Sequence, residues 1–131
     1  MGTPQSGTPK APRLSVEAMQ RLFNDGEYWR RMQEGEFVEE LIGYHRCNFP
    51  ELQERYPGIR GKSTFYKEAI SGAKVAEVHY YVLPDDTIIP AKRPDPKRLV
   101  HEGILYRQEC KAQRERRLAA ERGEDTGEVM Q

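Results

Sequence analysis

The chain has 131 residues, of which 37% are hydrophobic and 32% are charged, and its formal net charge is zero. This length suits one domain with tails, and the zero charge argues against a uniformly basic nucleic-acid binder. The charge is nevertheless unevenly spread, because residues 15–41 carry a net charge of −4 and residues 91–117 carry +5. A protein whose net charge is zero can therefore still have one basic face.

Residues 1–13 are rich in proline, glycine and polar side chains, so we expect a disordered leader. This segment lacks the apolar run of a secretory signal, and no later stretch is as long as a membrane span. Cys47 and Cys110 are too few for a disulfide scaffold and favour free thiols in a reducing compartment. We therefore predict a soluble, cytoplasmic protein.

The first predicted helix begins after Ser15, a good N-cap residue, and ends at the Asn-Asp-Gly turn of residues 24–26. Val16, Met19 and Phe23 recur along one face of this helix. These three side chains are therefore candidates for the core.

Residues 27–46 also carry apolar side chains at helical spacing, beginning with Trp29 and Met32. Gly35 weakens the middle of this segment and divides it into two helices. We interpret residues 36–46 as helix, because their paired apolar positions break a strict alternation. A strand in the same place is the alternative.

Two more helices are predicted in the centre of the chain. Pro50 suits the first position of a helix that Pro57 and Gly58 end. The next helix runs from Lys62 to Ser71, and Gly72 suits the position just after its end.

The pattern then changes from helices to strands. Alternating apolar and polar residues predict a strand, and adjacent prolines predict a stiff loop. The remaining elements, in chain order, are a strand at 75–82, a short partner strand at 87–91, a basic loop at 92–98, two strand pieces within 98–107, a charged helix at 108–122 and a disordered tail at 123–131.

These elements predict an α+β fold. We expect N-terminal helices with a helix-turn-helix-like arrangement, then a small antiparallel sheet or wing, then a C-terminal helix. One domain spans residues 14–107, followed by the charged helix at 108–122.

The segment YPGIRGKSTFYKEAISG, residues 56–72, carries the sharpest functional signal. Residues 50–72 resemble the helix-turn-helix segment of winged, excisionase-like DNA-binding proteins, with the turn at residues 57–60. The resemblance implies a non-enzymatic regulatory protein that reads DNA with a recognition helix at 62–71. The hairpin at 75–90 would then be the wing.

The predicted contacts with nucleic acid combine basic, hydroxyl and aromatic side chains. The start of a helix presents free N–H groups to phosphate, and a basic loop holds phosphates without strong base preference. We expect DNA rather than RNA as the partner, and no cofactor. The predicted contact residues are Arg60, Lys62, Ser63, Thr64, Tyr66, Lys67, Lys92, Arg93, Lys97 and Arg98.

Two alternatives stay open. His79, Tyr80 and Tyr81 on a predicted strand, with Arg93 and Lys97 in the next loop, are residue types that a small metal-independent ribonuclease uses for proton transfer and charge stabilisation. The charged C-terminal helix is instead typical of an adaptor subunit that docks other proteins.

No metal site is expected, because His45 and Cys47 are the only closely spaced pair of candidate ligands. The sequence also lacks the glycine-rich phosphate loop and the usual hydrolase motifs. The sequence therefore gives no reason to expect a bound cofactor.

Overall fold

The computed structural model describes residues 11–90 and 94–123, and a single β-sheet organises them. Six strands lie in the order β1-β6-β5-β4-β3-β2. Neighbouring strands are antiparallel except for β1 and β6, which are parallel. The strands are β1 (Arg13–Leu14), β2 (Val38–Arg46), β3 (Arg60–Lys67), β4 (Lys74–Val82), β5 (Asp95–His101) and β6 (Ile104–Gln108).

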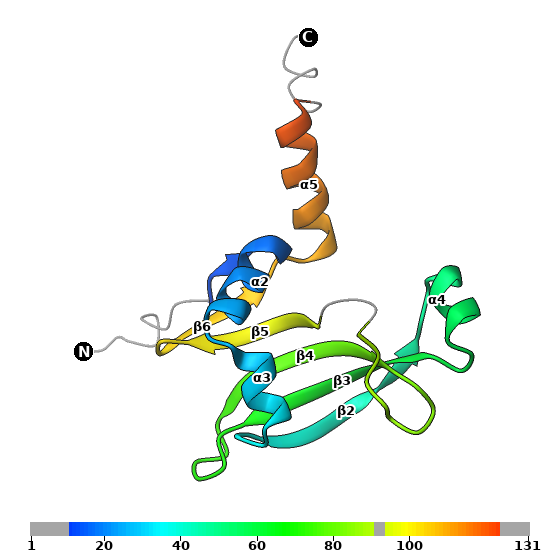
Figure 1. The fold of residues 1–131 in the computed structure, drawn as a ribbon. Helices are drawn as coiled ribbons and strands as arrows, with labels where there is room; N and C mark the ends of the chain where they lie inside the picture. Colours follow the sequence, from blue (N-terminus) through cyan, green and yellow to red (C-terminus); the bar gives the residue numbers. More distant parts are fainter. Residues whose placement is uncertain (1–10, 91–93, 124–131) are drawn as a thin grey trace.

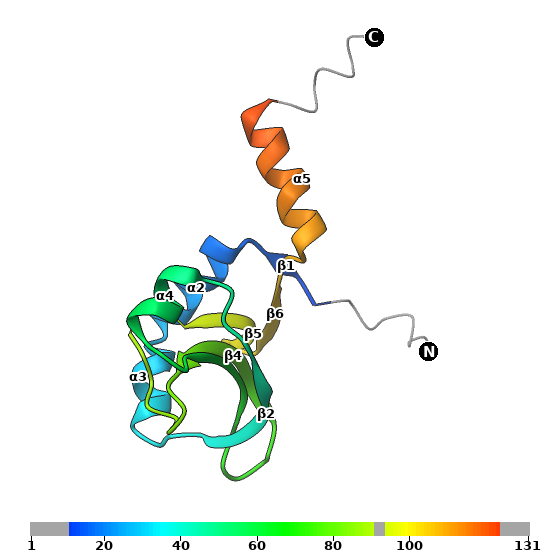
Figure 2. The same cartoon turned by 90° about the vertical axis from the view of Figure 1, so that its right-hand side faces the viewer.

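Four helices accompany the sheet: α2 (Val16–Asp25), α3 (Tyr28–Gln33), α4 (Pro50–Arg55) and α5 (Lys111–Arg122). Helices α2 and α3 lie against the sheet, α4 follows β2 at the far end, and α5 projects away after β6 (Figure 1). Figure 2 looks along the strands and shows β4 and β2 curving round, with α3 on the inner side of the curve. None of the described helices is long and apolar enough to cross a membrane.

The main core lies between the sheet and helices α2 and α3. In β4 every second side chain is buried, from Ala76 to Val82, which places those residues on the face that the helices cover. Met19 and Phe23 of α2 pack there, together with Met32 of α3. The other face of β4 carries the alternate, partly exposed residues and is called the charged face below.

A second, smaller core lies at the end of the sheet that carries α4. Leu52 of α4 packs with Cys47, Ile59 and Ile89, and Tyr81 of β4 contacts this cluster. Pro50 stands in the first turn of α4, where its missing N–H costs no hydrogen bond. This cluster anchors the C-terminal ends of β2 and β4.

The predicted fold class was wrong. The protein has a mixed α/β fold with a six-stranded sheet, and its short helices are interspersed among the strands. The expected set of N-terminal helices followed by a small wing is therefore absent from the described residues. The helix-turn-helix arrangement is absent with it, because residues 60–67, at its centre, are strand β3.

Two predicted helices are strands for identifiable reasons. Most of residues 36–46 form β2, an edge strand with exposed or half-exposed side chains, so their apolar spacing does not reflect burial. Residues 62–67 of the predicted helix are held extended between β2 and β4, where Thr64 and Tyr66 are buried, and residues 69–71 lie in the turn that follows. Threonine and tyrosine both suit a strand, and here their burial outweighs the helix signals around them.

Several predicted elements are confirmed. Ser15 caps α2 by accepting a hydrogen bond of 3.0 Å from the N–H of Ala18. The helix at Pro50 is present as α4, and the alternating segment 75–82 lies in β4.

Other boundaries differ. The strand expected at 87–91 is reduced, within residues 87–90, to an isolated bridge between Val82 and Ile88. From Asp95 onward the expected basic loop belongs to β5. Arg13, expected in the leader, belongs to β1, while residues 1–10 and 124–131 of the expected disordered ends lie outside the described residues.

Candidate functional site

Three arginines stand side by side on the charged face. The strand register places Arg13 of β1 opposite Arg107 of β6, and Arg107 opposite Arg98 of β5. Side chains in register on neighbouring strands are direct neighbours, and like charges in such positions repel each other. This arginine row, Arg13-Arg107-Arg98, therefore concentrates positive charge on the sheet.

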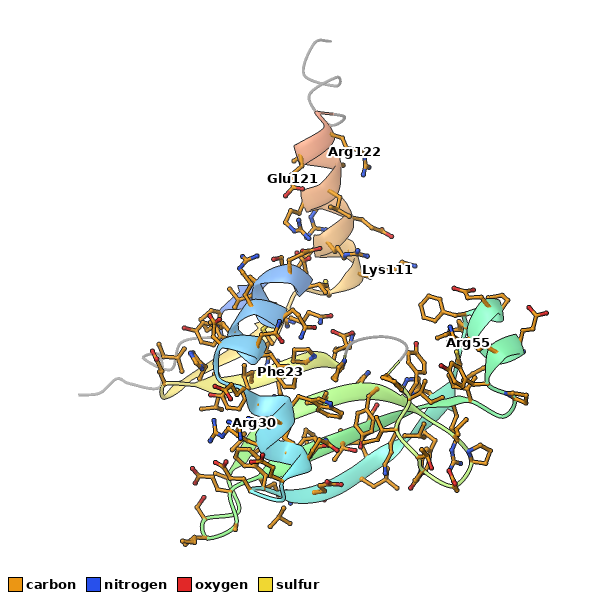
Figure 3. All side chains as sticks on the ribbon, in the orientation of Figure 1. Phe23, Arg30, Arg55, Lys111, Glu121 and Arg122 are labelled. Atoms are coloured by element: carbon orange, nitrogen blue, oxygen red, sulfur yellow. The ribbon has the colours of Figure 1, made fainter. Side chains whose placement is uncertain are left out.

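A cleft of about 730 Å³ opens over the arginine row and reaches the start of α5. Lys97, Lys111 and Arg114 also line it, which gives six cationic side chains against the three carboxylates of Glu77, Asp95 and Glu109. Figure 3 shows Lys111 at the base of α5. We call this hollow the cationic cleft.

The three carboxylates of the cationic cleft are already paired. Glu77 contacts His79 at 3.0 Å, Asp95 contacts Lys97 at 2.8 Å, and Glu109 contacts Arg117 at 2.8 Å. The hydrogen bond from Arg117 lowers the pKa of Glu109 and so favours its charged form.

The other cationic side chains of the cleft have no carboxylate partner among the described residues. Within the described residues, the arginine row, Lys111 and Arg114 form no ion pair within 4.0 Å. Arg13 donates a hydrogen bond of 3.2 Å to the backbone oxygen of Gln108 and keeps its charge unbalanced. The cleft consequently has a surplus of positive charge.

A second hollow of about 430 Å³ adjoins the cationic cleft, and His79, Asp95 and Lys97 line both. His45 of β2 also lines this second hollow, which we call the histidine hollow. The ring centres of His45 and His79 are 5.5 Å apart. Partial burial is the main cause that lowers the pKa of His45, and His79 and Lys97 lower it further, so the neutral imidazole is favoured.

Aromatic side chains form part of the wall of the histidine hollow. Phe49, just before α4, is partly exposed and packs edge-on against Tyr81 with ring centres 6.1 Å apart. Burial raises the pKa of Tyr81, which favours its neutral phenol. The hollow thus places apolar rings beside imidazoles and an ammonium group.

The residues predicted to contact nucleic acid are divided between the two faces of the sheet. Lys97 and Arg98 line the cationic cleft. Thr64 and Tyr66 are buried on the helix-covered face, where Thr64 Oγ1 lies 2.9 Å from the hydroxyl of Tyr80. Ser63 is buried on the charged face, in register with His79.

The other predicted contacts have partners elsewhere. Arg60 and Lys62 contact the carboxylate of Asp86 at 3.3 and 3.2 Å. Lys67 forms an ion pair of 2.7 Å with Glu40. Lys92 and Arg93 lie outside the described residues. Whether any of the ten binds nucleic acid stays a prediction.

Sequence reasoning missed several residues of this site, among them Arg13, Arg107 and His45. Arg13 stood in the expected leader, and Arg107 was one charge among many near the C-terminus. The proximity of Arg13 and Arg107 follows from the β1–β6 register, which pairs segments far apart in the sequence. His45 was weighed as a metal ligand, although the described residues contain no cluster of three side chains able to hold a metal ion.

Comparisons with protein-family models, with curated proteins and with solved structures gave no match for this chain. The chemistry of the two hollows therefore guides the assignment of function.

Proposed function

We propose that the protein binds single-stranded nucleic acid, with the phosphate backbone in the cationic cleft. The observation that carries this proposal is the arginine row, whose three side chains stand in register without an ion-pair partner among the described residues. Arginine is well suited to bind phosphate groups, because its planar guanidinium donates paired hydrogen bonds. A phosphate backbone would relieve the repulsion within the row.

The choice of a single strand rests on the neighbouring aromatic residues. Proteins that bind single strands without sequence preference combine a positively charged groove with rings on which bases stack. Phe49 and Tyr81 line the histidine hollow next to the cleft, so they are available to bases whose phosphates contact Arg98 or Lys97. The recognition helix that favoured duplex DNA is replaced by strand β3.

We place this function in the cytoplasm. Cys47 and Cys110 are free thiols, which suits a reducing compartment.

Fluorescence anisotropy with a labelled oligonucleotide of about a dozen nucleotides tests the proposal. We expect binding to weaken steeply between about 50 and 200 mM salt, because bound phosphates release counterions. For a single strand, each lost phosphate contact reduces the slope of log K against log salt by about 0.7. Arg107→Gln and Arg98→Gln should each show this reduction and a lower affinity.

Arg55→Gln is the matched control. It removes the same charge from α4, far from α5 (Figure 3), and Arg55 lines neither hollow. Its affinity and salt slope should equal those of the unmodified protein. Equal losses in all three variants, or no binding at about 50 mM salt, would refute the proposal, provided that circular dichroism shows folded protein.

The adaptor alternative stays a prediction. Helix α5, expected to dock partners, buries none of its side chains fully, and Arg117 ties it to Glu109 and to Glu17 of α2. Failure of nucleic-acid binding in the anisotropy experiment would favour this alternative.

A further inference from the structure

We propose that His45 and His79 are catalytic residues that cleave bound RNA by metal-independent transfer of the phosphoryl group to the neighbouring 2′-hydroxyl. This inference rests on the proposed function, since the cationic cleft would hold the strand being cut. It adds a chemical step to binding and specifies RNA, because DNA lacks the attacking hydroxyl.

The sheet brings the two imidazoles together from strands that are not neighbours. His45 is on β2 and His79 on β4, with β3 between them. Gly61 of β3 stands in register with His45, and a Cβ at position 61 would overlap the imidazole. The missing side chain lets the ring of His45 lie over β3, with its centre 5.5 Å from that of His79.

The two rings differ in their surroundings, as a base and an acid must. His45 has no hydrogen-bonded carboxylate among the described residues, and its lowered pKa favours the neutral form that accepts a proton. His79 Nε2 lies 3.0 Å from Glu77 Oε2, so that carboxylate holds the ring and balances the charge of an imidazolium. The Nδ1 atom of His79 is then the nitrogen left for the substrate.

The reaction needs no co-reactant. His45 takes the proton of the 2′-hydroxyl, and the 2′-oxygen forms a bond to phosphorus. The bond from phosphorus to the 5′-oxygen breaks, and His79 donates its proton to that oxygen. The products are a 2′,3′-cyclic phosphate on one fragment and a 5′-hydroxyl on the other.

Lys97 is placed to stabilise the charge that develops on the phosphorane. It lines both hollows, so a phosphate between the arginine row and the histidines lies beside it. Asp95 at 2.8 Å and Gln108 at 3.1 Å hold its ammonium group in place. Gln108 also donates a hydrogen bond of 2.6 Å to Asp95, which completes the support.

The test uses the full chain and a DNA oligonucleotide that contains a single ribonucleotide, in buffer with EDTA. Cleavage is followed on a denaturing gel, and mass spectrometry identifies the ends. We expect cleavage after the ribonucleotide with a cyclic phosphate end. His45→Gln and His79→Gln should each lower the rate by at least about 100-fold, which is the usual contribution of a general acid or base.

His101→Gln is the matched control, since His101 is the third histidine of the chain and lines neither hollow. Its cleavage rate should stay within about threefold of the unmodified rate, well inside the effect of a lost acid or base. Cleavage that is equal in all three histidine variants would show a contaminating nuclease and overturn the inference.

Binding separates the two proposals. Anisotropy with the all-DNA oligonucleotide measures binding of the unmodified chain to a strand that it cannot cleave by this reaction. Tight, salt-dependent binding without cleavage of the ribonucleotide would overturn the histidine mechanism and leave the proposed function intact. Absence of binding would overturn both.

Discussion

The imidazole of His45 lies against the backbone of Gly61, the residue directly opposite it on β3. Any other residue at position 61 would place a Cβ inside the space that the ring occupies. Gly61 is itself buried, so the histidine covers the strand where a side chain would otherwise stand. The close approach of His45 to His79 therefore depends on a glycine in a third strand.

Gly61→Ala should separate the two histidine rings without unfolding the protein. The methyl group displaces the ring of His45, while alanine is favoured over glycine in a strand by about 0.5–1 kcal/mol. The nuclear Overhauser effect between the His45 and His79 rings should disappear, with little loss in the free energy of unfolding. Gly43→Ala is the control, because a Cβ at Gly43 meets nothing within 4 Å. Persistence of the signal in Gly61→Ala would contradict this account.

Tyr80→Phe should destabilise the protein by about 1–3 kcal/mol, the cost of an unsatisfied buried hydroxyl. The hydroxyl groups of Tyr80 and Thr64 lie 2.9 Å apart in the core, so the substitution leaves Thr64 without this partner. Urea unfolding measures the loss. Adding Thr64→Val should cost less than the sum of the two single changes, because both hydroxyls are then absent. Strict additivity would show that the pair is not coupled.

Phe23→Ala should cost about 3–5 kcal/mol, as expected for a large aromatic side chain removed from a packed core. Phe23 is 1% exposed and packs against Tyr28 and Trp29. Ile70→Ala, at a fully exposed position, should change stability by less than about 0.5 kcal/mol. Thermal or urea unfolding compares the two, and similar costs would contradict the assignment of the main core.

Asp86→Asn should lower the free energy of unfolding at neutral pH and have little effect on it at acidic pH. The hydrogen bond from Tyr44, followed by those from Lys62 and Arg60, lowers the pKa of Asp86 in the folded state. The stabilisation is therefore present above the unfolded value of about 3.9 and is lost as the pH falls through the lower folded pKa. Asparagine tolerates the positive φ of 70° at this position, so the backbone is preserved.

Urea unfolding at a series of pH values measures this effect. The stability difference between Asp86→Asn and the unmodified protein should shrink as the pH falls below about 4. Asp25→Asn is the control, because Asp25 forms no ion pair with a described residue, and its effect at neutral pH should be smaller. A difference for Asp86→Asn that is constant with pH would contradict the carboxylate's role.

The sequence correctly predicted those elements that are determined by their own residues and not by pairing with distant segments. Ser15 and Pro50 mark the starts of α2 and α4 through their own chemistry, and the alternation from residue 75 onward follows the burial of one face of β4. By contrast, β2 is an edge strand, so its apolar residues follow no pattern of burial. β3 is extended because β2 and β4 hold it on both sides, and neither pairing is visible in residues 60–67 alone.

The candidate site was predictable only in fragments. Lys97 and Arg98 stood out as part of a basic stretch, and His79 stood out on an alternating strand. Arg13 and His45 join them through strand pairings between distant segments. Register is specified by burial of one face, and β2 has no buried side chain, so the sequence alone does not show which residue stands opposite His45.

Because β1 pairs with β6, the arginine row can form only late in synthesis of the chain. Arg13 and Gln108 are 95 positions apart in the chain, yet a hydrogen bond joins them. At about 5–20 residues per second, a ribosome would take roughly 5 to 20 seconds to travel from one to the other. Until β6 has been synthesised, Arg13 lacks the strand that places it beside Arg107, so an incomplete chain lacks the complete arginine row. Under the proposed function, the nascent chain would therefore not bind its own mRNA during translation.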